Sequence, residues 1–82
     1  MALQITQKWS SGSTVTTKVL NSGTTEQNAV VHLVVRLVGG QDETLISDPT
    51  PVPAGTTRAV HLQASGTVEY ILDSPEPFVQ AE

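Results

Sequence analysis

Two histidines, His32 and His61, are the side chains of this 82-residue sequence best suited to proton transfer near neutral pH. A serine or threonine nucleophile needs such a base beside it, together with a group that orients the base. The sequence has no cysteine, and its serines gather in turn sequences such as residues 10–13, without a G-x-S-x-G elbow. The sequence therefore predicts a protein that is not an enzyme.

The same histidines could share a metal ion only if they faced one another. They lie on the third and the fifth expected strands, which occupy opposite sheets of a β-sandwich, so their imidazoles should point apart. Asp42, Glu43 and Asp48 share one loop region but lack the alternating spacing of a calcium loop. Gly39-Gly40 indicates a turn and no phosphate-binding loop. We expect no metal and no cofactor.

Three aromatic residues, Trp9, Tyr70 and Phe78, are the complete aromatic set. A carbohydrate-binding surface needs exposed rings on which sugars can stack. Trp9 is in phase with Leu3 and Ile5, and Tyr70 is in phase with inward positions of its own segment, so both are predicted to lie in the core. A glycan-binding module would require Trp9 or Tyr70 to be exposed.

The elements that must position these residues are strands. Val, Thr and Ile make up 25 of the 82 residues, and β-branched side chains fit a pleated sheet better than a helix. The formal net charge of −4 argues against binding to nucleic acid or to an anionic membrane. No apolar run is long enough to insert into a membrane, and residues 1–9 do not resemble a signal peptide. Localisation stays open between cytoplasmic synthesis, a virion and an excised extracellular domain.

Short segments of period-two hydrophobicity alternate with Gly- and Pro-containing turns, which is typical of a sandwich or a small barrel. A first strand carries Leu3, Ile5 and Trp9 on one face, with Gln7 as an exception. Further strands or short strand-like segments are expected at Thr14–Leu20, Ala29–Val38, Leu45-Ile46, Thr56–Leu62 and Thr67–Leu72. Three prolines make 49–55 a rigid loop.

Four segments of this pattern resemble small bacterial and archaeal immunoglobulin-like domains of the cell-adhesion-related (CARDB) type. They are Val15–Thr24, with its V-x-V-x-N-x-G-like strand and turn, Ala29–Leu37, Pro53–Thr57 and Gly66–Tyr70. The resemblance covers residues 13–73, and prolines follow where the family has its last strand. It implies one antiparallel immunoglobulin-like β-sandwich of six or seven strands, comprising residues 1–82, that serves adhesion, spacing or assembly without catalysis.

The most informative segment is Ala29–Val38, because it is apolar on both faces. If this strand pairs with Thr67–Leu72, its outward valines form an apolar patch together with one isoleucine of the neighbouring strand. The members of this patch are Val30, Val34, Val38 and Ile71. A contiguous patch on a small domain favours contact with a protein partner or a second copy. Cover by Leu45-Ile46 or Phe78-Val79, and plain exposure, are the alternatives.

The C-terminal segment, residues 74–82, contains Pro75 and Pro77, which exclude a helix and a central strand. Because Phe78 and Val79 follow these prolines, we expect them to dock as an edge strand on their own sandwich or as an arm on a neighbour. A frayed terminus is the alternative. Charge is also asymmetric, with +2 in residues 1–40 and −6 in residues 41–82, so opposite patches could steer head-to-tail contacts.

These observations predict a non-enzymatic interaction module that mediates protein–protein assembly or adhesion. Two settings fit the sequence: an adhesion or spacer domain of a larger surface protein, and a small structural protein such as a virion decoration or cement subunit. A carbohydrate-binding module is a further alternative. The expected interface contains Val30, Val34, Val38, Ile71, Phe78 and Val79, with no nucleic acid and no membrane insertion.

Overall fold

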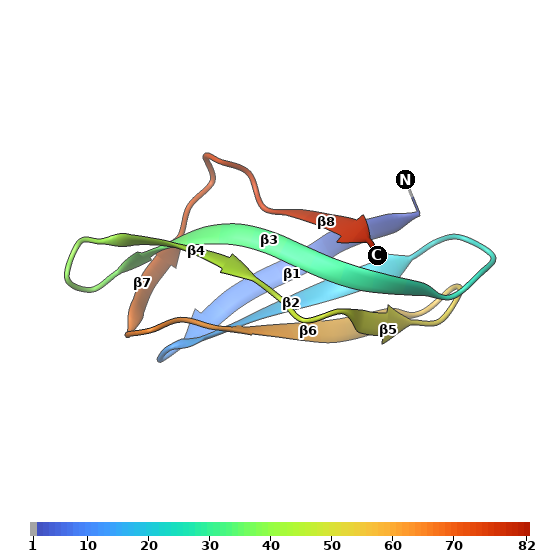
Figure 1. Ribbon diagram of the computed structural model, residues 1–82, viewed down its shortest axis with the longest axis horizontal. Helices are drawn as coiled ribbons and strands as arrows, with labels where there is room; N and C mark the ends of the chain where they lie inside the picture. The colour runs from blue at the N-terminus through green and yellow to red at the C-terminus, as the bar shows by residue number, and fades with distance from the viewer. Residues whose placement is uncertain (1) are drawn as a thin grey trace.

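The computed structural model describes residues 2–82, and within that range it contains strands and turns but no helix (Figure 1). The strands are β1 (Leu3–Ser11), β2 (Thr14–Asn21), β3 (Gln27–Leu37), β4 (Asp42–Ile46), β5 (Thr50–Val52), β6 (Thr57–Gln63), β7 (Val68–Ile71) and β8 (Phe78–Ala81). Strands β1, β2 and β6 form sheet A, and the other five form sheet B around β3. All strand pairs are antiparallel, which confirms the predicted β-sandwich.

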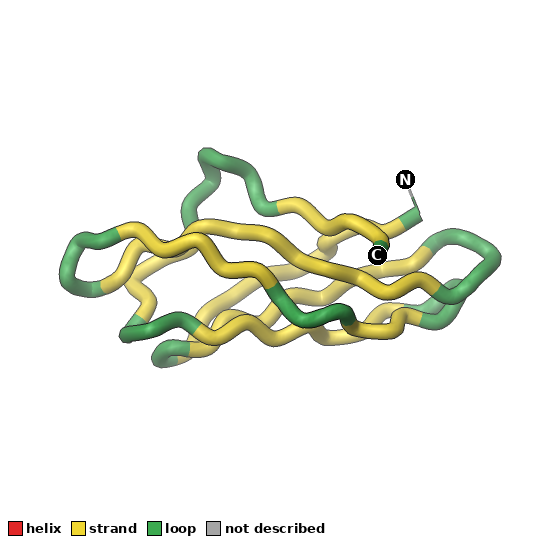
Figure 2. Tube along the Cα trace, viewed as in Figure 1, coloured by secondary structure: helices red, strands yellow, loops and turns green. Residues whose placement is uncertain are grey.

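Sheet B has one continuous strand with an interrupted flank on each side (Figure 2). Ala29 of β3 pairs with Thr50 on one side and with Ala81 on the other. His32 likewise pairs with both Ile46 and Phe78. It follows that β4 and β5 lie along one side of β3, whereas β7 and β8 lie along the other. Residues 2–82 contain eight strands instead of six or seven because each flank is divided into two.

Proline explains where the flanks are interrupted, since it cannot donate to a sheet ladder and is confined to edges and breaks. The predicted rigid loop at 49–55 is partly strand, because Thr50–Val52 pairs with Gln27–Ala29 at the sheet edge. Ser47 bridges the gap before it: its Oγ accepts from the Val31 N–H at 2.8 Å, and its own N–H donates to the Val31 carbonyl at 2.9 Å. The ladder along β3 therefore continues across the break.

Aliphatic side chains and the fully buried Thr17 fill the core between the two sheets. Its buried hydrophobic members are Leu3, Val15, Val19, Ala29, Val31, Leu33, Val35, Leu45, Val52, Val60, Leu62, Ala64, Val68 and Val79. All three aromatic side chains lie outside it, with 44% of Trp9, 45% of Tyr70 and 51% of Phe78 exposed. The prediction that Trp9 and Tyr70 are core residues was therefore wrong.

Two β-bulges explain why Trp9 and Tyr70 face outward instead of into the core. The register between β1 and β2 shifts between Ile5 and Gln7, so that Trp9 lies opposite Thr16 on the outer face of sheet A. A second shift separates Val68 from Tyr70 along β3, so that Tyr70 faces outward. An extra residue in one strand of a pair reverses the facing of every residue beyond it, because side chains alternate with a period of two.

Asn21 ties the two sheets together at one end of the sandwich. Its side chain is fully buried, and its Nδ2 donates to the carbonyls of Thr25 and of Val52 in β5, both at 2.9 Å. Its Oδ1 accepts from the Gly23 N–H at 2.9 Å. A Cβ on Gly23 would approach this Oδ1 to 3.2 Å and the Cβ of Ala2 to 3.0 Å, so glycine suits the turn. The Asn-x-Gly sequence thus has a structural explanation.

Candidate functional site

The outer face of sheet B carries a row of side chains that crosses three strands. His32 stands at the centre, Ile46 lies opposite it on β4, and Phe78 lies opposite it on β8. We call these three residues the outer row. Ile46 is 62% exposed, so the row presents apolar and aromatic surface to solvent at the middle of the sheet.

The rings of His32 and Phe78 stack, with their centroids 4.5 Å apart and their planes 4° from parallel. This contact orders both side chains across the β3–β8 pair, as cross-strand aromatic pairs do. The Nε2 atom of His32 is enclosed and has no hydrogen-bond partner among residues 2–82. The stack therefore presents a flat, ordered ring surface.

A second row of the same face holds an ion pair. The guanidinium of Arg36 binds the carboxylate of Asp42 through two hydrogen bonds, Nε to Oδ1 and Nη2 to Oδ2, the latter at 3.3 Å. It also lies over the ring of Tyr70, 5.6 Å from the centroid, in a cation–π contact. The hydrogen bond from Arg36 lowers the pKa of Asp42, and the same bond raises the pKa of Arg36. Tyr70 is thus held in place while part of its ring stays exposed.

A hollow of about 230 Å³ lies beside the outer row. The turn before β8 forms one wall with Pro75 and Glu76, while Val34 and Thr44 contribute from β3 and β4. Its remaining lining residues are His32, Leu33 and Phe78. The hollow and the outer row form one uneven surface, and a partner side chain could insert into the hollow.

The predicted interface residues occupy three different environments. Val34 and Phe78 lie on the outer face of sheet B, as expected, and Val34 is partly buried. Val30 shares that face but is only 8% exposed, so its own chain covers it. Val38 is 62% exposed, in the turn after β3. Val79, the remaining valine of the predicted interface, belongs to the core.

Two predicted interface residues face inward. Ile71 pairs with Val35 and packs against the core, because the β7 bulge reverses its facing. Val79 pairs with Val31 and is 6% exposed. The four-residue patch of Val30, Val34, Val38 and Ile71 is consequently not formed, and this geometric expectation is corrected. The docking expected for Phe78-Val79 takes the form of an edge strand on β3 of the same chain.

Sequence reasoning missed two members of the exposed surface, Ile46 and Tyr70. Ile46 was treated as a possible cover for β3, whereas it lies beside β3 in the sheet. Its neighbour Leu45 is buried, and simple alternation from Leu45 would have placed Ile46 outward. Tyr70 had no comparable signal, because its facing depends on the bulge.

The outer face of sheet A has a different chemistry. Trp9 and His61 flank Thr16 on the two neighbouring strands, and Thr16 Oγ1 lies 3.2 Å from His61 Nδ1. Lys18 stands two residues further along β2 on the same face. None of the eight acidic residues of the chain belongs to a strand of sheet A. This face is polar, with one lysine and one exposed indole.

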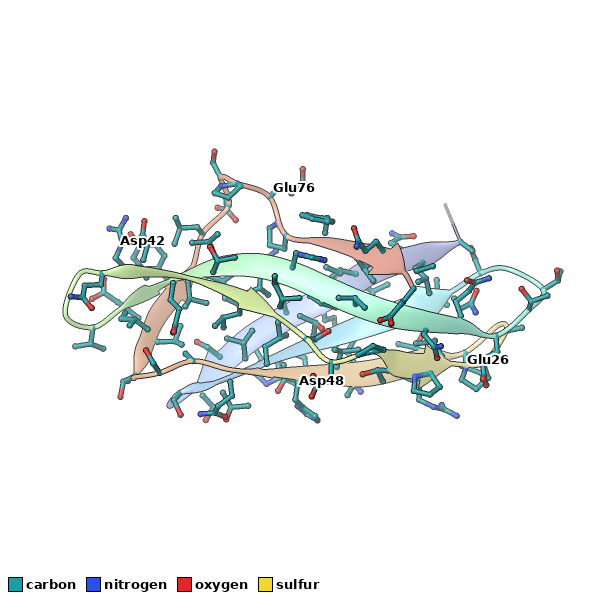
Figure 3. All side chains as sticks on the ribbon, in the orientation of Figure 1. Glu26, Asp42, Asp48 and Glu76 are labelled. Carbon is teal, nitrogen blue, oxygen red and sulfur yellow. The ribbon has the colours of Figure 1, made fainter. Side chains whose placement is uncertain are left out.

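Potential catalytic and metal-binding groups do not converge within residues 2–82. His32 and His61 lie on the outer faces of different sheets, as predicted. Four carboxylates, those of Glu26, Asp42, Asp48 and Glu76, stand at separate points on the periphery (Figure 3). No group of three or more His, Cys, Asp or Glu side chains is placed to hold an ion in that range. The described residues include no helix long and apolar enough to cross a membrane.

Comparisons of the chain with protein-family models, with curated proteins and with solved structures found no match.

Proposed function

We propose that this protein is a non-enzymatic interaction module that binds a protein partner through the outer face of sheet B. One observation carries the proposal: the core is built from aliphatic side chains, while every aromatic side chain is exposed. Aromatic residues concentrate at the centres of protein interfaces, where they bring much contact area at low entropic cost. Phe78 and Tyr70 both lie on this face, and Ile46 lies across His32 from Phe78.

Order in the free protein favours binding by this surface. Phe78 is held by its stack on His32, and Tyr70 by Arg36, so little side-chain entropy remains to be lost on association.

Charge around the face defines the chemistry of the partner. Glu76 borders the hollow, Glu69 lies in the short β7 strand, and Asp73 follows that strand. An acidic rim around an apolar centre complements a partner that has an apolar patch bordered by Lys or Arg. Adhesion or spacing within a larger surface protein and assembly on a virion remain the two settings in which such a module would act.

Kinship with the cell-adhesion-related immunoglobulin-like domains is part of the same proposal. The β1-β2-β6 order of sheet A corresponds to the A-B-E order of immunoglobulin-type sandwiches. The buried Asn21 with Gly23 gives the resembling strand-and-turn segment a physical role. Strand β8 differs from the family pattern, since it shares one side of β3 with β7.

The test replaces Ile46 by Lys, which adds a charge at the exposed centre of the face without entering the core. Proteins captured from the source cells by the native chain and by Ile46→Lys are quantified side by side. Gln4→Lys, an exposed change on β1 of sheet A, is the matched control. We expect a specific partner to be lost with Ile46→Lys and kept with Gln4→Lys, at unchanged melting temperatures. Equal capture by both variants would refute the role of this face.

A second candidate function, glycan binding, is favoured by the exposure of Trp9. The indole lies on a polar face with Thr16 and His61 beside it and Lys18 nearby, so a sugar ring could stack on it and accept hydrogen bonds. Titration with a panel of neutral and anionic oligosaccharides, followed by Trp9 fluorescence, tests this candidate. A saturable change that Trp9→Ala abolishes and Ile46→Lys preserves would support it, and a flat titration would remove it.

A further inference from the structure

The sheet edges of this protein differ in how well they are protected against pairing with a strand of another chain. Both edges of sheet B are interrupted, and each interruption contains at least one proline. Strand β1, one edge of sheet A, carries a bulge after Ile5 and a charge at Lys8. Bulges, prolines and lysines are the usual devices that stop edge strands from pairing with other chains. Strand β6 has none of them: it runs through Thr57–Gln63 in unbroken register with β2, and Arg58 is its sole charged residue.

The hydrogen bonds at the two ends of the β2–β6 pair show which backbone groups β6 leaves free. Ala64 N–H donates to the Ser13 carbonyl at 2.8 Å, and Asn21 N–H donates to the Thr56 carbonyl at 2.9 Å. Hydrogen-bonded pairs recur at every second position of an antiparallel ladder, so the even-numbered residues of β6 bond to β2. The odd-numbered residues, Thr57, Ala59, His61 and Gln63, direct their N–H and C=O groups away from it.

The outward backbone N–H and C=O groups of β6 are almost free of hydrogen bonds within the described residues. Apart from a 3.5 Å contact from the Arg58 guanidinium to the Thr57 carbonyl, no hydrogen bond among residues 2–82 engages them. The edge therefore offers a ladder of consecutive donor–acceptor pairs over seven residues, which is enough for addition of another strand.

We propose that β6 pairs with β6 of a second copy, antiparallel and about a two-fold axis at Val60. In this register Ala59 of one copy lies opposite His61 of the other, and Thr57 lies opposite Gln63. All four outward residues of each copy then exchange hydrogen bonds, and two three-stranded sheets become one sheet of six strands. The pairing uses the edge of sheet A and does not depend on the proposed function of the sheet B face.

Side chains in this register are compatible with a second copy. On the inward face, Val60 meets Val60 of the partner copy, and Arg58 lies opposite Leu62. The two Arg58 side chains are four positions apart, about 13 Å at the usual strand rise, and so beyond the screening length at physiological salt. No carboxylate lies on any strand of sheet A to oppose another. A closed two-fold contact of this kind is the commonest form of self-association.

Analytical ultracentrifugation from about 10 μM to about 1 mM tests the pairing, a range suited to weak association. We expect a monomer–dimer equilibrium in the native chain. Ala59→Pro removes an outward N–H and keeps the bonds to β2, and His61→Lys adds an edge charge in case the proline variant does not fold. Either should weaken dimerisation at least tenfold. A monomer at every concentration, or a dimer unaffected by a folded variant, would overturn the proposal. Dimerisation lost only with Ile46→Lys would also overturn it, and would instead indicate self-association through sheet B.

Cysteine cross-linking tests the register, since the native chain has no cysteine. The double variant Ala59→Cys/His61→Cys places each thiol opposite its counterpart in the second copy. Thr57→Cys, whose two copies lie about 20 Å apart in this register, is the control. Covalent dimer from the double variant alone supports the proposed pairing, and dimer from both or from neither overturns it. Higher salt should strengthen the association, because each copy has a formal net charge of −4.

Discussion

Sheet A and sheet B enclose one aliphatic core but leave different parts of themselves unprotected. Sheet A has three strands without proline, three of the four basic residues and no acidic residue. Sheet B has one long strand between two interrupted flanks, and the acidic residues lie on its strands and in the loops of the chain. Sheet A leaves the β6 backbone open at its edge, whereas sheet B leaves apolar and aromatic side chains open on its face.

This difference separates two kinds of contact. Strand addition at β6 depends on main-chain hydrogen bonds and tolerates many side chains, whereas binding at the outer row depends on the shape and chemistry of Ile46, His32 and Phe78. Substitutions on one sheet should consequently leave contacts of the other unchanged, because the two surfaces are separated by the core and share no residue.

The largest effect is expected where the two sheets are joined, at Asn21. Asn21→Ala leaves the buried carbonyl of Val52 without its donor and removes the bonds to Thr25 and Gly23, so we expect a loss of about 3 kcal/mol in the free energy of unfolding. Urea denaturation measures it. Asn28→Ala, an exposed asparagine of β3, is the matched control and should change the free energy by less than about 0.5 kcal/mol. Equal effects would mean that aliphatic packing alone joins the sheets.

The parts of the fold that could be predicted from the sequence are those in which alternation is unbroken. The β2 segment was expected at Thr14–Leu20 and extends to Asn21, and the β6 segment was expected at Thr56–Leu62 and lies at Thr57–Gln63. In both, β-branched and aliphatic residues alternate with polar ones over a full strand, and one face is buried. Such a pattern fixes both the strand and its facing.

The candidate site was less predictable, because bulges decide which residues face outward. Gln7, a polar residue in an otherwise apolar phase, was the one visible sign that β1 changes facing before Trp9. In β7, Tyr70 and Ile71 are adjacent, so either could face the core, and the choice depends on pairing with β3. Beyond a bulge, the direction of each side chain depends on pairing between segments that are distant in the sequence. A local hydrophobic pattern holds no information about that pairing.

A smaller effect should distinguish an exposed aromatic residue from a core valine. We expect Trp9→Ala to cost less than about 1 kcal/mol, because nearly half of the indole is already in water. Val35→Ala removes two methyl groups from a fully buried position in β3 and should cost about 2 kcal/mol. Thermal and urea denaturation of both variants gives the comparison. If Trp9→Ala proved the more destabilising change, Trp9 would contribute to the core and the β1 bulge would be absent in solution.

The smallest effect should come from the ion pair on the face of sheet B. The hydrogen bond from Arg36 lowers the pKa of Asp42 below its ordinary value of 3.8, so the folded state favours the ionised carboxylate. The stabilisation from this group is fully present above that ordinary value and is lost as pH falls through the lower folded pKa. Both side chains are partly exposed, so the contribution is small. We expect the melting temperature of the native chain to fall slightly more than that of Asp42→Asn as pH is lowered through this range. If the melting temperatures of the two proteins fell in parallel with pH, the ion pair would not stabilise the fold, and Tyr70 alone would hold Arg36 in place. The face of sheet B would then have no stabilising ion pair to distinguish it from sheet A.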